Sequence, residues 1–491
     1  MTQGGMLLQG TLYGLVFLLC VVVFAKARAR KVRQAVLLIA SYVLYLTWGI
    51  WFAAVLLTST AMNFLLGEWL RRKPALGVLS TGIALNLALL SSFKYLPELA
   101  VHIPLSSLQR FSHLVLPVGI SFWTFQAMSY LLDLYRGEDL DPSFFEFALY
   151  MVFFPVTISG PICRMPEMLP QFRSEDAIPW DDIGRGSSRI AMGVLMVLLA
   201  RLLGQGILSG DGINSGFDHA TRWSGTDVWC LAFGYGLQLF FDFAGYSHIA
   251  IGAAKTLGFK LPENFARPFQ STSASIFWTR WHMSLSFWIR DYVFLPLATL
   301  RREVWWRNLA LVVAMVLFGL WHRASLLFLL WGCYHGVLLV LHRQVQQLQR
   351  KFDWTPPAIV WTPVSWITTM AALNLGWIFF RAKSLVETRQ MLSAVVSPES
   401  YLGHFLSGSL YLLVAGLAVG YATVLLVIAV LDRHSVEPQP LKAAVDPGVM
   451  GLIARWRWLW IAPLYAVALI FLLIVTFAHG TSAAQFMYGN F

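Results

Sequence analysis

The sequence predicts an all-α protein that crosses a membrane many times. Of its 491 residues, 57% are hydrophobic and only 12% are charged, whereas soluble domains carry about 25% charged residues. Aromatic residues make up 15% of the chain, which suits interfacial belts and tightly packed helices. Apolar runs recur along the whole length, so we expect a single integral-membrane domain over residues 1–491 with no soluble module.

Most of the apolar runs are long enough to span a bilayer as helices. They lie at about residues 7–25, 35–57, 75–92, 113–134, 189–209, 228–253, 362–380, 406–431 and 458–478. The first run has no basic segment before it and no clear cleavage site, so it is interpreted as a membrane helix rather than a signal peptide. Shorter runs at 58–70, 144–162, 276–300, 308–321 and 324–341 predict tilted or re-entrant pieces buried in protein. About ten to twelve spans are expected in all.

Basic residues indicate the orientation of the spans. Clusters at 26–33, 71–73, 301–307 and 343–351 can all be cytoplasmic, which places the N-terminus outside. The basic residues between 381 and 389 fit this scheme poorly. The net charge of +11 then reports basic loops, so no nucleic acid partner is expected. The four cysteines are scattered without a CxxC pair, which indicates neither a disulfide framework nor a metal site.

Two histidines lie in the apolar hairpin formed by residues 308–341. His322 follows Gly319-Leu320-Trp321 at the expected tip, and His335 lies in the second arm. The 14 residues from Asn308 to Trp321 would extend about 21 Å as a helix, against a hydrocarbon core of about 30 Å. His322 is therefore expected inside the membrane, nearer the extracytoplasmic face. An ionisable group there is a candidate catalytic residue, although a hydrogen-bonded structural histidine is the alternative.

A second polar cluster lies in the aromatic segment 277–292, which contains Arg280 and His282. Read as a single helix, the segment places Trp278, Trp281 and Trp288 near one face, the pattern of an interfacial helix anchored by tryptophan. The same segment can also line a cytoplasmic entrance, where Arg280 and His282 would meet an anionic donor, because the guanidinium group recognises phosphate well.

Other polar groups occur within predicted spans. Asp242 is either a structural carboxylate or a group that orients a histidine or a substrate. Ser121, Thr124 and Gln126 follow Pro117 and Gly119, which are expected to unwind the start of a helix. Such small polar side chains usually join helices to one another.

Several intramembrane histidines beside Arg and Asp favour proton transfer, because the imidazole group titrates near neutrality. A buried histidine next to a hydroxyl and a thioester would suit acyl transfer, with most of the rate gain coming from holding both reactants together. No G-x-S-x-G, P-loop, G-x-G-x-x-G or H-E-x-x-H motif competes with this interpretation.

At these residues the chain resembles the membrane-bound O-acyltransferase (MBOAT) family, and within it the bacterial branch of alginate O-acetyltransferases and their cellulose and peptidoglycan relatives. The similar motifs occur in order over most of the chain. They cover residues 37–42, 93–95, 116–137, 159–172, 235–265, 277–297, 319–322, 377–382 and the aromatic tail 485–491.

The resemblance implies a ring of helices around a thin centre, with a catalytic core at about 113–382, a cytoplasmic tunnel for the donor and an opposing funnel for the acceptor. It identifies His322 as the catalytic histidine and His282 as the second one, with Arg280 and Trp321 on the donor side. No tightly bound cofactor is implied. Acetyl-CoA, or a carrier-protein thioester, would be the co-substrate.

The resemblance further implies acyl transfer, expected to be acetyl transfer, toward an extracytoplasmic polysaccharide in the bacterial inner membrane. A periplasmic or extracellular acyltransferase of the SGNH type is the expected partner, and membrane lipids surround the chain. The chain departs from the family at Arg323, where a glycine is usual. This cation either faces an anionic acceptor or extends outward. A transporter and a non-catalytic scaffold of a secretion complex are the alternative functions.

Overall fold

The structure is a computed structural model that describes residues 3–27, 29–97, 100, 114–207, 210–219, 222–354 and 356–434. These residues are helical apart from loops and one isolated bridge between Phe265 and Trp281. They form two compact units. The described part of the first covers residues 3–190 and 246–380, and that of the second covers residues 191–245 and 381–434. The predicted all-α fold class is confirmed, while the single domain remains a prediction.

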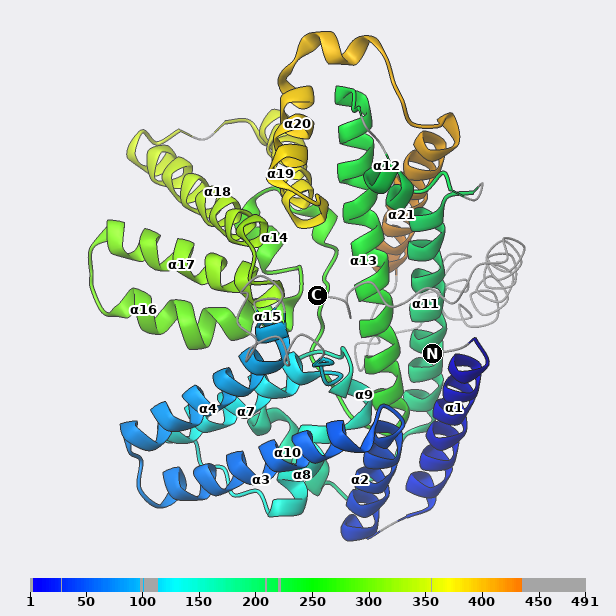
Figure 1. Ribbon diagram of the computed structural model, residues 1–491, viewed down its shortest axis with the longest axis vertical. Coiled ribbons are helices and arrows are strands. Elements are labelled where there is room, and N and C mark those ends of the chain that lie inside the picture. The colour runs from blue at the N-terminus through cyan, green and yellow to red at the C-terminus, as the bar shows by residue number, and fades with distance from the viewer. Residues whose placement is uncertain are drawn as a thin grey trace, which may run out of the picture. The chain divides into compact units, whose positions relative to one another are not determined.

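The first unit begins with α1 to α4 and continues with the α7 to α10 segment (Figure 1). The helices are α1 (Gln3–Lys26), α2 (Arg30–Leu46), α3 (Ile50–Arg72), α4 (Leu76–Lys94), α7 (Ile120–Tyr135), α8 (Phe144–Val152), α9 (Phe154–Thr157) and α10 (Met165–Arg173).

Shorter pieces and a long hairpin complete the first unit. They are α14 (Ala274–Trp278), α15 (Met283–Ile289), a π-helical turn (Arg290–Phe294), α16 (Leu295–Thr299), α17 (Val304–His322), α18 (Leu326–Lys351) and α19 (Ala358–Arg381), whose last residue falls in the second unit. Helices α11 (Trp180–Gln205) and α13 (Gly225–Thr256) contribute residues to both units. The second unit also contains α12 (Ile213–His219), α20 (Leu385–Val396) and α21 (Gly408–His434).

Eight helices in the described ranges are long and apolar enough to cross a membrane, namely α3, α4, α11, α13, α17, α18, α19 and α21. The predicted span at 458–478 and the tail 485–491 lie outside the described residues, so the count of ten to twelve remains a prediction. The predicted unwinding of the helix start at Pro117 and Gly119 is confirmed. Helix α7 begins at Ile120, directly after Gly119 in a left-handed conformation.

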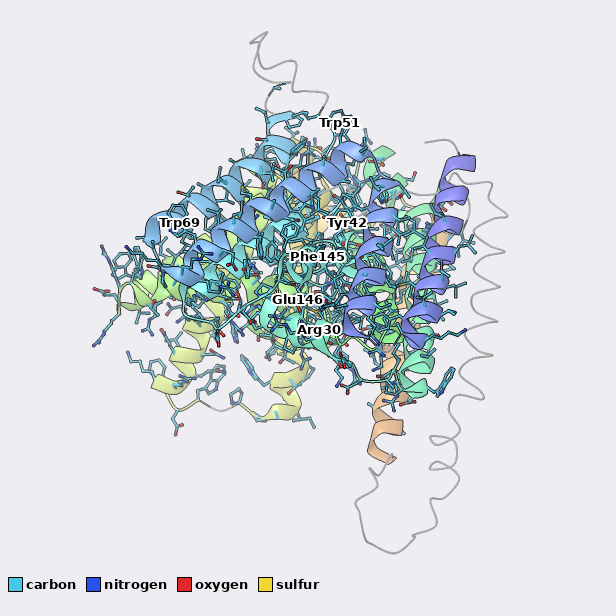
Figure 2. The ribbon with its side chains drawn as sticks, turned by 90° about the horizontal axis from the view of Figure 1, so that it is seen from below. Arg30, Tyr42, Trp51, Trp69, Phe145 and Glu146 are labelled. Carbon is cyan, nitrogen blue, oxygen red and sulfur yellow. The ribbon has the colours of Figure 1, made fainter. Side chains whose placement is uncertain are left out.

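Helix α3 carries a tryptophan near each end. Trp51 and Trp69 are 80% and 59% exposed and lie at opposite ends of the helix (Figure 2). Their separation of 18 positions corresponds to about 27 Å along a helix, which approximates the thickness of a hydrocarbon core. Tryptophan side chains prefer the two interfaces of a bilayer, so their spacing fits α3 as a complete span.

Two expected boundaries are wrong. The apolar run 35–57 is divided at Gly49, which has a φ of 141°, and its second part joins the run 58–70 to form α3. The hairpin arms are also longer than expected, because α17 begins at Val304 and α18 continues to Lys351. Helix α17 has 19 residues, or about 28 Å. Each arm can therefore span alone, and His322 lies at the far end of its span rather than short of it.

The arms α17 and α18 lie side by side (Figure 1). Glycine permits this close approach. A Cβ atom on Gly332 would come within 2.5 Å of the carbonyl oxygen of Met315, and one on Gly319 within 2.3 Å of that of Phe328. Small residues of this kind allow helix backbones to meet in membranes. The backbone packing thus fixes where the tip of the hairpin places its side chains.

Candidate functional site

His322 is the last residue of α17 and only 4% of it is exposed. Helix α17 ends here because the chain turns through Arg323 into Ser325, whose side chain caps α18 by accepting the backbone N–H of Phe328. Aromatic rings surround the imidazole. Their centroids lie 4.6 to 6.1 Å away and belong to Trp321, Phe380, Phe318, Trp331 and Phe328. These five rings form an aromatic shell that holds the imidazole and excludes bulk water.

His282 lies in a tight turn between α14 and α15. The predicted single helix over 277–292 is wrong, because the chain breaks after α14 and His282 adopts a left-handed conformation with a φ of 43°. The three tryptophans of this segment are at most 7% exposed. They pack inside the protein and are not interfacial anchors.

Hydrogen bonds from a distant loop hold this turn. Asn264 is fully buried and accepts the hydroxyl of Ser284 through Oδ1 at 2.7 Å. Its Nδ2 donates to the hydroxyl of Ser247 at 3.0 Å. The Ser284 hydroxyl in turn accepts the backbone N–H of Ile162 at 3.0 Å. These bonds fix the backbone on both sides of the unusual conformation at His282.

The two histidines share their aromatic neighbours. The ring of His282 lies 6.2 Å from those of both Phe318 and Trp321, measured between centroids, and the same two rings contact His322. Burial lowers the pKa of His282 to about 3, so its imidazole is neutral and can accept a hydrogen bond. The structure thus brings together the two histidines that the sequence singled out.

His335 continues the aromatic shell along α18. The residue is fully buried, and neither ring nitrogen has a hydrogen-bond partner among the described residues. Its ring lies 4.8 Å from Trp331 and 5.2 Å from Trp278, and both tryptophans also contact Phe318. The three histidines therefore border one continuous group of aromatic side chains.

The other predicted donor-side residues differ in their surroundings. Trp321 is 7% exposed and its indole N–H has no acceptor in the described part of the chain. Arg280 is half-buried, and its carbonyl accepts the N–H of Ala266 at 3.0 Å. Arg323 is exposed at the turn after α17, which fits an outward cation better than one packed against the buried His322 ring. The roles of these residues remain predictions.

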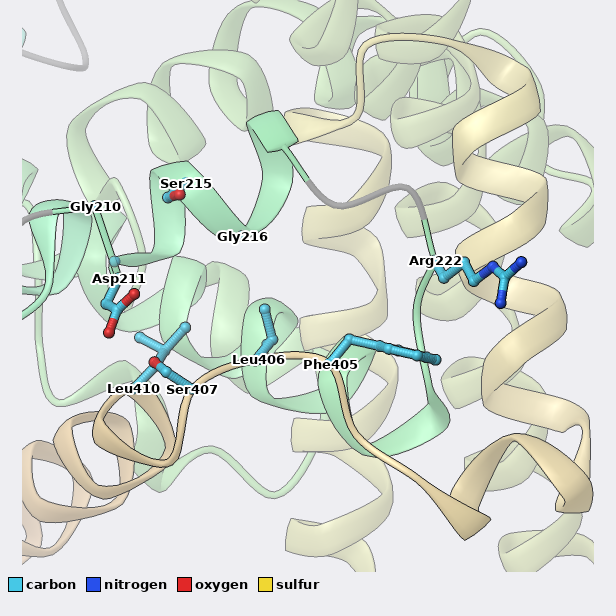
Figure 3. A pocket seen from close by; sticks show the side chains of 10 residues that line it. Gly210, Asp211, Ser215, Gly216, Arg222, Phe405, Leu406, Ser407 and Leu410 are labelled. Atoms are coloured by element: carbon cyan, nitrogen blue, oxygen red, sulfur yellow. The ribbon is translucent and has the colours of Figure 1, made fainter.

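Asp242 lies on the part of α13 that belongs to the second unit, and it is 6% exposed. Its role remains a prediction. The second unit also has a cavity of about 320 Å³, with Asp211 at one end and Arg222 and Phe405 at the other (Figure 3). No residue predicted for the site lines this cavity. Among the described residues, no group of three or more potential metal ligands occurs.

Two adjoining hollows of about 300 and 320 Å³ lie in the first unit between α14, α18 and α19. Ser273, His342 and Trp361 line both. The apolar end is formed by Ala274, Leu338 and Leu373. Ala274 and Leu338 lie about one helical turn from Trp278 and His335, so the hollow approaches the aromatic shell from the α18 end that carries the basic residues 343–351.

Sequence reasoning missed three functional candidates. Asn264 and Ser284 carry no pattern that shows their contact with each other. Lys94 lies within a motif of the resemblance, but only the structure shows its ammonium group 4.8 Å above the ring of Trp321. A cation near the end of an apolar run was the one signal that could have pointed to it.

Comparison with known proteins gives a consistent answer. The family model of MBOAT, the membrane-bound O-acyltransferase family, matches residues 37–380. A probable alginate O-acetylase, AlgI, of Pseudomonas putida is 31% identical over 94% of this chain and 95% of its own length. A peptidoglycan O-acetyltransferase of Helicobacter pylori is 32% identical over 73% of each chain.

A teichoic acid D-alanyltransferase of Bacillus subtilis is 30% identical over 54% of this chain and 69% of its own. The matched region contains both buried histidines and the aromatic shell around them, and it includes seven of the eight helices that can cross a membrane. The chain is a membrane protein and an O-acyltransferase, and it belongs to the membrane-bound O-acyltransferase family.

Proposed function

We propose that this protein transfers an acetyl group from a cytoplasmic thioester to an extracytoplasmic polysaccharide, with His322 as the catalytic base or transient acyl carrier. The observation that carries the proposal is the burial of His322 at the end of a complete span, within an aromatic shell that also contains His282. The names of the alginate and peptidoglycan relatives support acetyl as the group transferred.

Acting as a base, the His322 imidazole would take the proton of an acceptor hydroxyl while that oxygen attacks the thioester carbonyl. The proton then passes to the departing thiolate. Rigid aromatic walls favour this reaction because they hold the imidazole in one orientation and keep water from hydrolysing the thioester. His282 faces the same rings and would help to shape the donor side with Arg280 and Trp321.

The donor is proposed to be acetyl-CoA, or a carrier-protein thioester. The hollow lined by Ser273, His342 and Leu338 supports a donor path, because it has a polar end near the basic residues 343–351 and an apolar end near the aromatic shell. A pantetheine-like arm has the same mixed character. Arg350 and Lys351 end α18, where they can attract an anionic donor.

The names of the relatives support a proposal for the acceptor and the location. Alginate, peptidoglycan and teichoic acid are the substrates that their names state, and all are extracytoplasmic polymers. We propose a bacterial inner-membrane location, with direct transfer or relay through a periplasmic or extracellular acyltransferase of the SGNH type. Asp242 and Arg323 are proposed to act in support, on the substrate side.

The test uses the full chain in proteoliposomes with acetyl-labelled acetyl-CoA on one side and a polysaccharide acceptor, with or without its partner enzyme, on the other. His322→Ala should abolish labelling of the acceptor while the protein remains folded. His404→Ala is the matched control, because His404 is an exposed loop residue of the second unit, and it should label the acceptor normally. Normal labelling by the His322 variant would refute the proposal.

The same assay separates the alternative functions. A transporter would move the donor or polymer without consuming thioester, so no free thiol would appear. A scaffold would leave acceptor labelling independent of His322. The O-acyltransferase proposal requires one free thiol for each acyl group transferred.

A further inference from the structure

Lys94 lies beside the catalytic histidine although it is 228 residues away in sequence. It ends α4, and its Nζ lies 4.8 Å above the ring of Trp321. The same indole ring lies 4.6 Å from the ring of His322 and 6.2 Å from that of His282. The ring of Trp321 therefore neighbours a cation and two imidazoles.

The end of α4 is fixed at this place by a second contact. The hydroxyl of Tyr95 donates to the backbone carbonyl of Leu320 at 3.0 Å, just before Trp321 and His322 in α17. Two further rings pack against Trp321, since Phe125 lies 5.5 Å and Phe122 lies 6.4 Å away. The position of Lys94 is thus a built feature of the site and not a flexible surface side chain.

Independently of these contacts, the charge distribution places Lys94 and His322 on the same side of the membrane. Helix α4 follows the basic residues 71–73, and α17 begins within the basic cluster 301–307. Both helices therefore start at the predicted cytoplasmic face, and Lys94 and His322 both lie at the opposite ends. A lysine at this depth is costly unless it is compensated. The face of an indole ring compensates part of this cost through a cation–π interaction.

We propose that the Lys94 ammonium group stabilises the negative charge that forms on the acyl carbonyl oxygen during transfer. This inference rests on the acyl transfer proposed above. Preorganised positive charge near a developing oxyanion acts strongly in a site that excludes water. The buried indole N–H of Trp321, which has no acceptor among the described residues, is a second donor in the same place.

The electron flow in this step is as follows. The acceptor oxygen forms a bond to the thioester carbon as its proton moves to His322, and the carbonyl π electrons move onto the carbonyl oxygen. Lys94 stabilises that oxyanion without giving up a proton. The intermediate then collapses, the carbon–sulfur bond breaks, and the thiolate receives the proton from His322. No oxidant, metal or further reactant is required.

The test measures steady-state acetyl transfer by the full chain in proteoliposomes, with acetyl-CoA as donor. Lys94→Met keeps the length of the side chain but removes its charge, and Lys94→Arg keeps the charge. Lys73→Met is the matched control, because Lys73 is an exposed lysine before the other end of α4. Lys94→Gln provides a second uncharged variant if the methionine variant does not fold.

We expect Lys94→Met or Lys94→Gln to lower kcat roughly 100-fold, as loss of one oxyanion donor does, with little change in KM for acetyl-CoA. Lys94→Arg should recover part of kcat, and Lys73→Met should match the wild type. The inference is overturned if the uncharged variants keep kcat within about threefold of the wild type, far from the roughly 100-fold loss of an oxyanion donor, or if only KM for an anionic acceptor rises. If His322→Ala remains active, the proposed function itself fails, which is a distinguishable result.

Discussion

Removing the Ser284 hydroxyl tests whether the hydrogen-bond network around Asn264 sets the position of His282. In Ser284→Ala, the hydroxyl no longer donates to Asn264 Oδ1 at 2.7 Å and no longer accepts the N–H of Ile162 at 3.0 Å. Both bonds are buried. The Oδ1 atom of Asn264 still accepts the Ser284 backbone N–H at 3.3 Å, but the N–H of Ile162 loses its acceptor.

The magnitude follows from these two bonds. A buried hydrogen bond contributes about 1 kcal/mol, and an orphaned buried donor costs about 1–3 kcal/mol more. We therefore expect Ser284→Ala to lose about 3 kcal/mol of stability. Because His282 has a left-handed backbone that the neighbouring bonds hold in place, the loosened turn should also lower acetyl transfer by about 10-fold to 100-fold, as a shift of about 1 Å does.

The assay pairs thermal unfolding in detergent with acetyl transfer in proteoliposomes. Ser275→Ala is the matched control, because Ser275 is exposed on α14, and both of its measurements should equal those of the wild type. If Ser284→Ala unfolds at the wild-type temperature and keeps wild-type turnover, the network does not hold the His282 turn and the reasoning is wrong. Loss of stability with unchanged turnover would make the network structural only.

Two further substitutions test features outside the site. Burial alone would raise the pKa of the Glu146 carboxyl, but the Arg173 guanidinium and Ser143 lower this pKa to about 2. Arg30 also pairs with the Glu146 carboxylate (Figure 2). A lowered pKa stabilises the folded state at pH values above the pKa of the unfolded state, about 4.3. This stabilisation is lost as the pH falls toward 2. Glu146→Gln should thus cost about 3 kcal/mol at pH 7 and flatten the acid side of a thermal stability profile; an unchanged profile would contradict this. Gly119→Ala should abolish folded protein, because its Cβ would lie 1.8 Å from the Thr157 carbonyl oxygen and the residue has a φ of +73°. The control Gly77→Ala has open space around the added Cβ and should give normal folded protein in a fluorescence size-exclusion assay.

The sequence was sufficient for most helices, because an apolar run leaves few alternatives in a membrane. It misplaced boundaries where composition alone is ambiguous. The break before α3 is not marked by a polar segment. Gly49 interrupts a hydrophobic run by its backbone conformation. Likewise Trp305 and Trp306 belong to α17, although tryptophan near a basic cluster is equally typical of an interfacial loop.

The basic residues 381–389 show a different limit. They fitted the predicted orientation poorly, and two of them take part in a tertiary contact. Arg381 and Lys383 both pair with Asp218, at 3.0 and 3.2 Å. These two residues therefore have a structural role within the second unit, which the sequence pattern could not show.

The segment around His282 could not be predicted from local pattern, because its tryptophans have helical spacing while its backbone is not helical. Three hydrogen bonds from Asn264 to Ser247 and Ser284 join positions that are 17 and 20 residues away. Tertiary bonds of this kind override the helical propensity of a short segment. The histidine itself was found from sequence, but the geometry that makes it useful was not.

The two histidines are therefore positioned by two different physical devices. His322 depends on the backbone packing of α17 against α18, where Gly319 and Gly332 permit close approach. His282 depends on a hydrogen-bonded turn. Where one reaction needs a fixed donor side and a fixed acceptor side, independent supports are useful, because a substrate that disturbs one support leaves the other in place. The aromatic rings of Phe318 and Trp321 contact both imidazoles, so they join the two supports, and the indole N–H of Trp321 is the one polar group of these two rings.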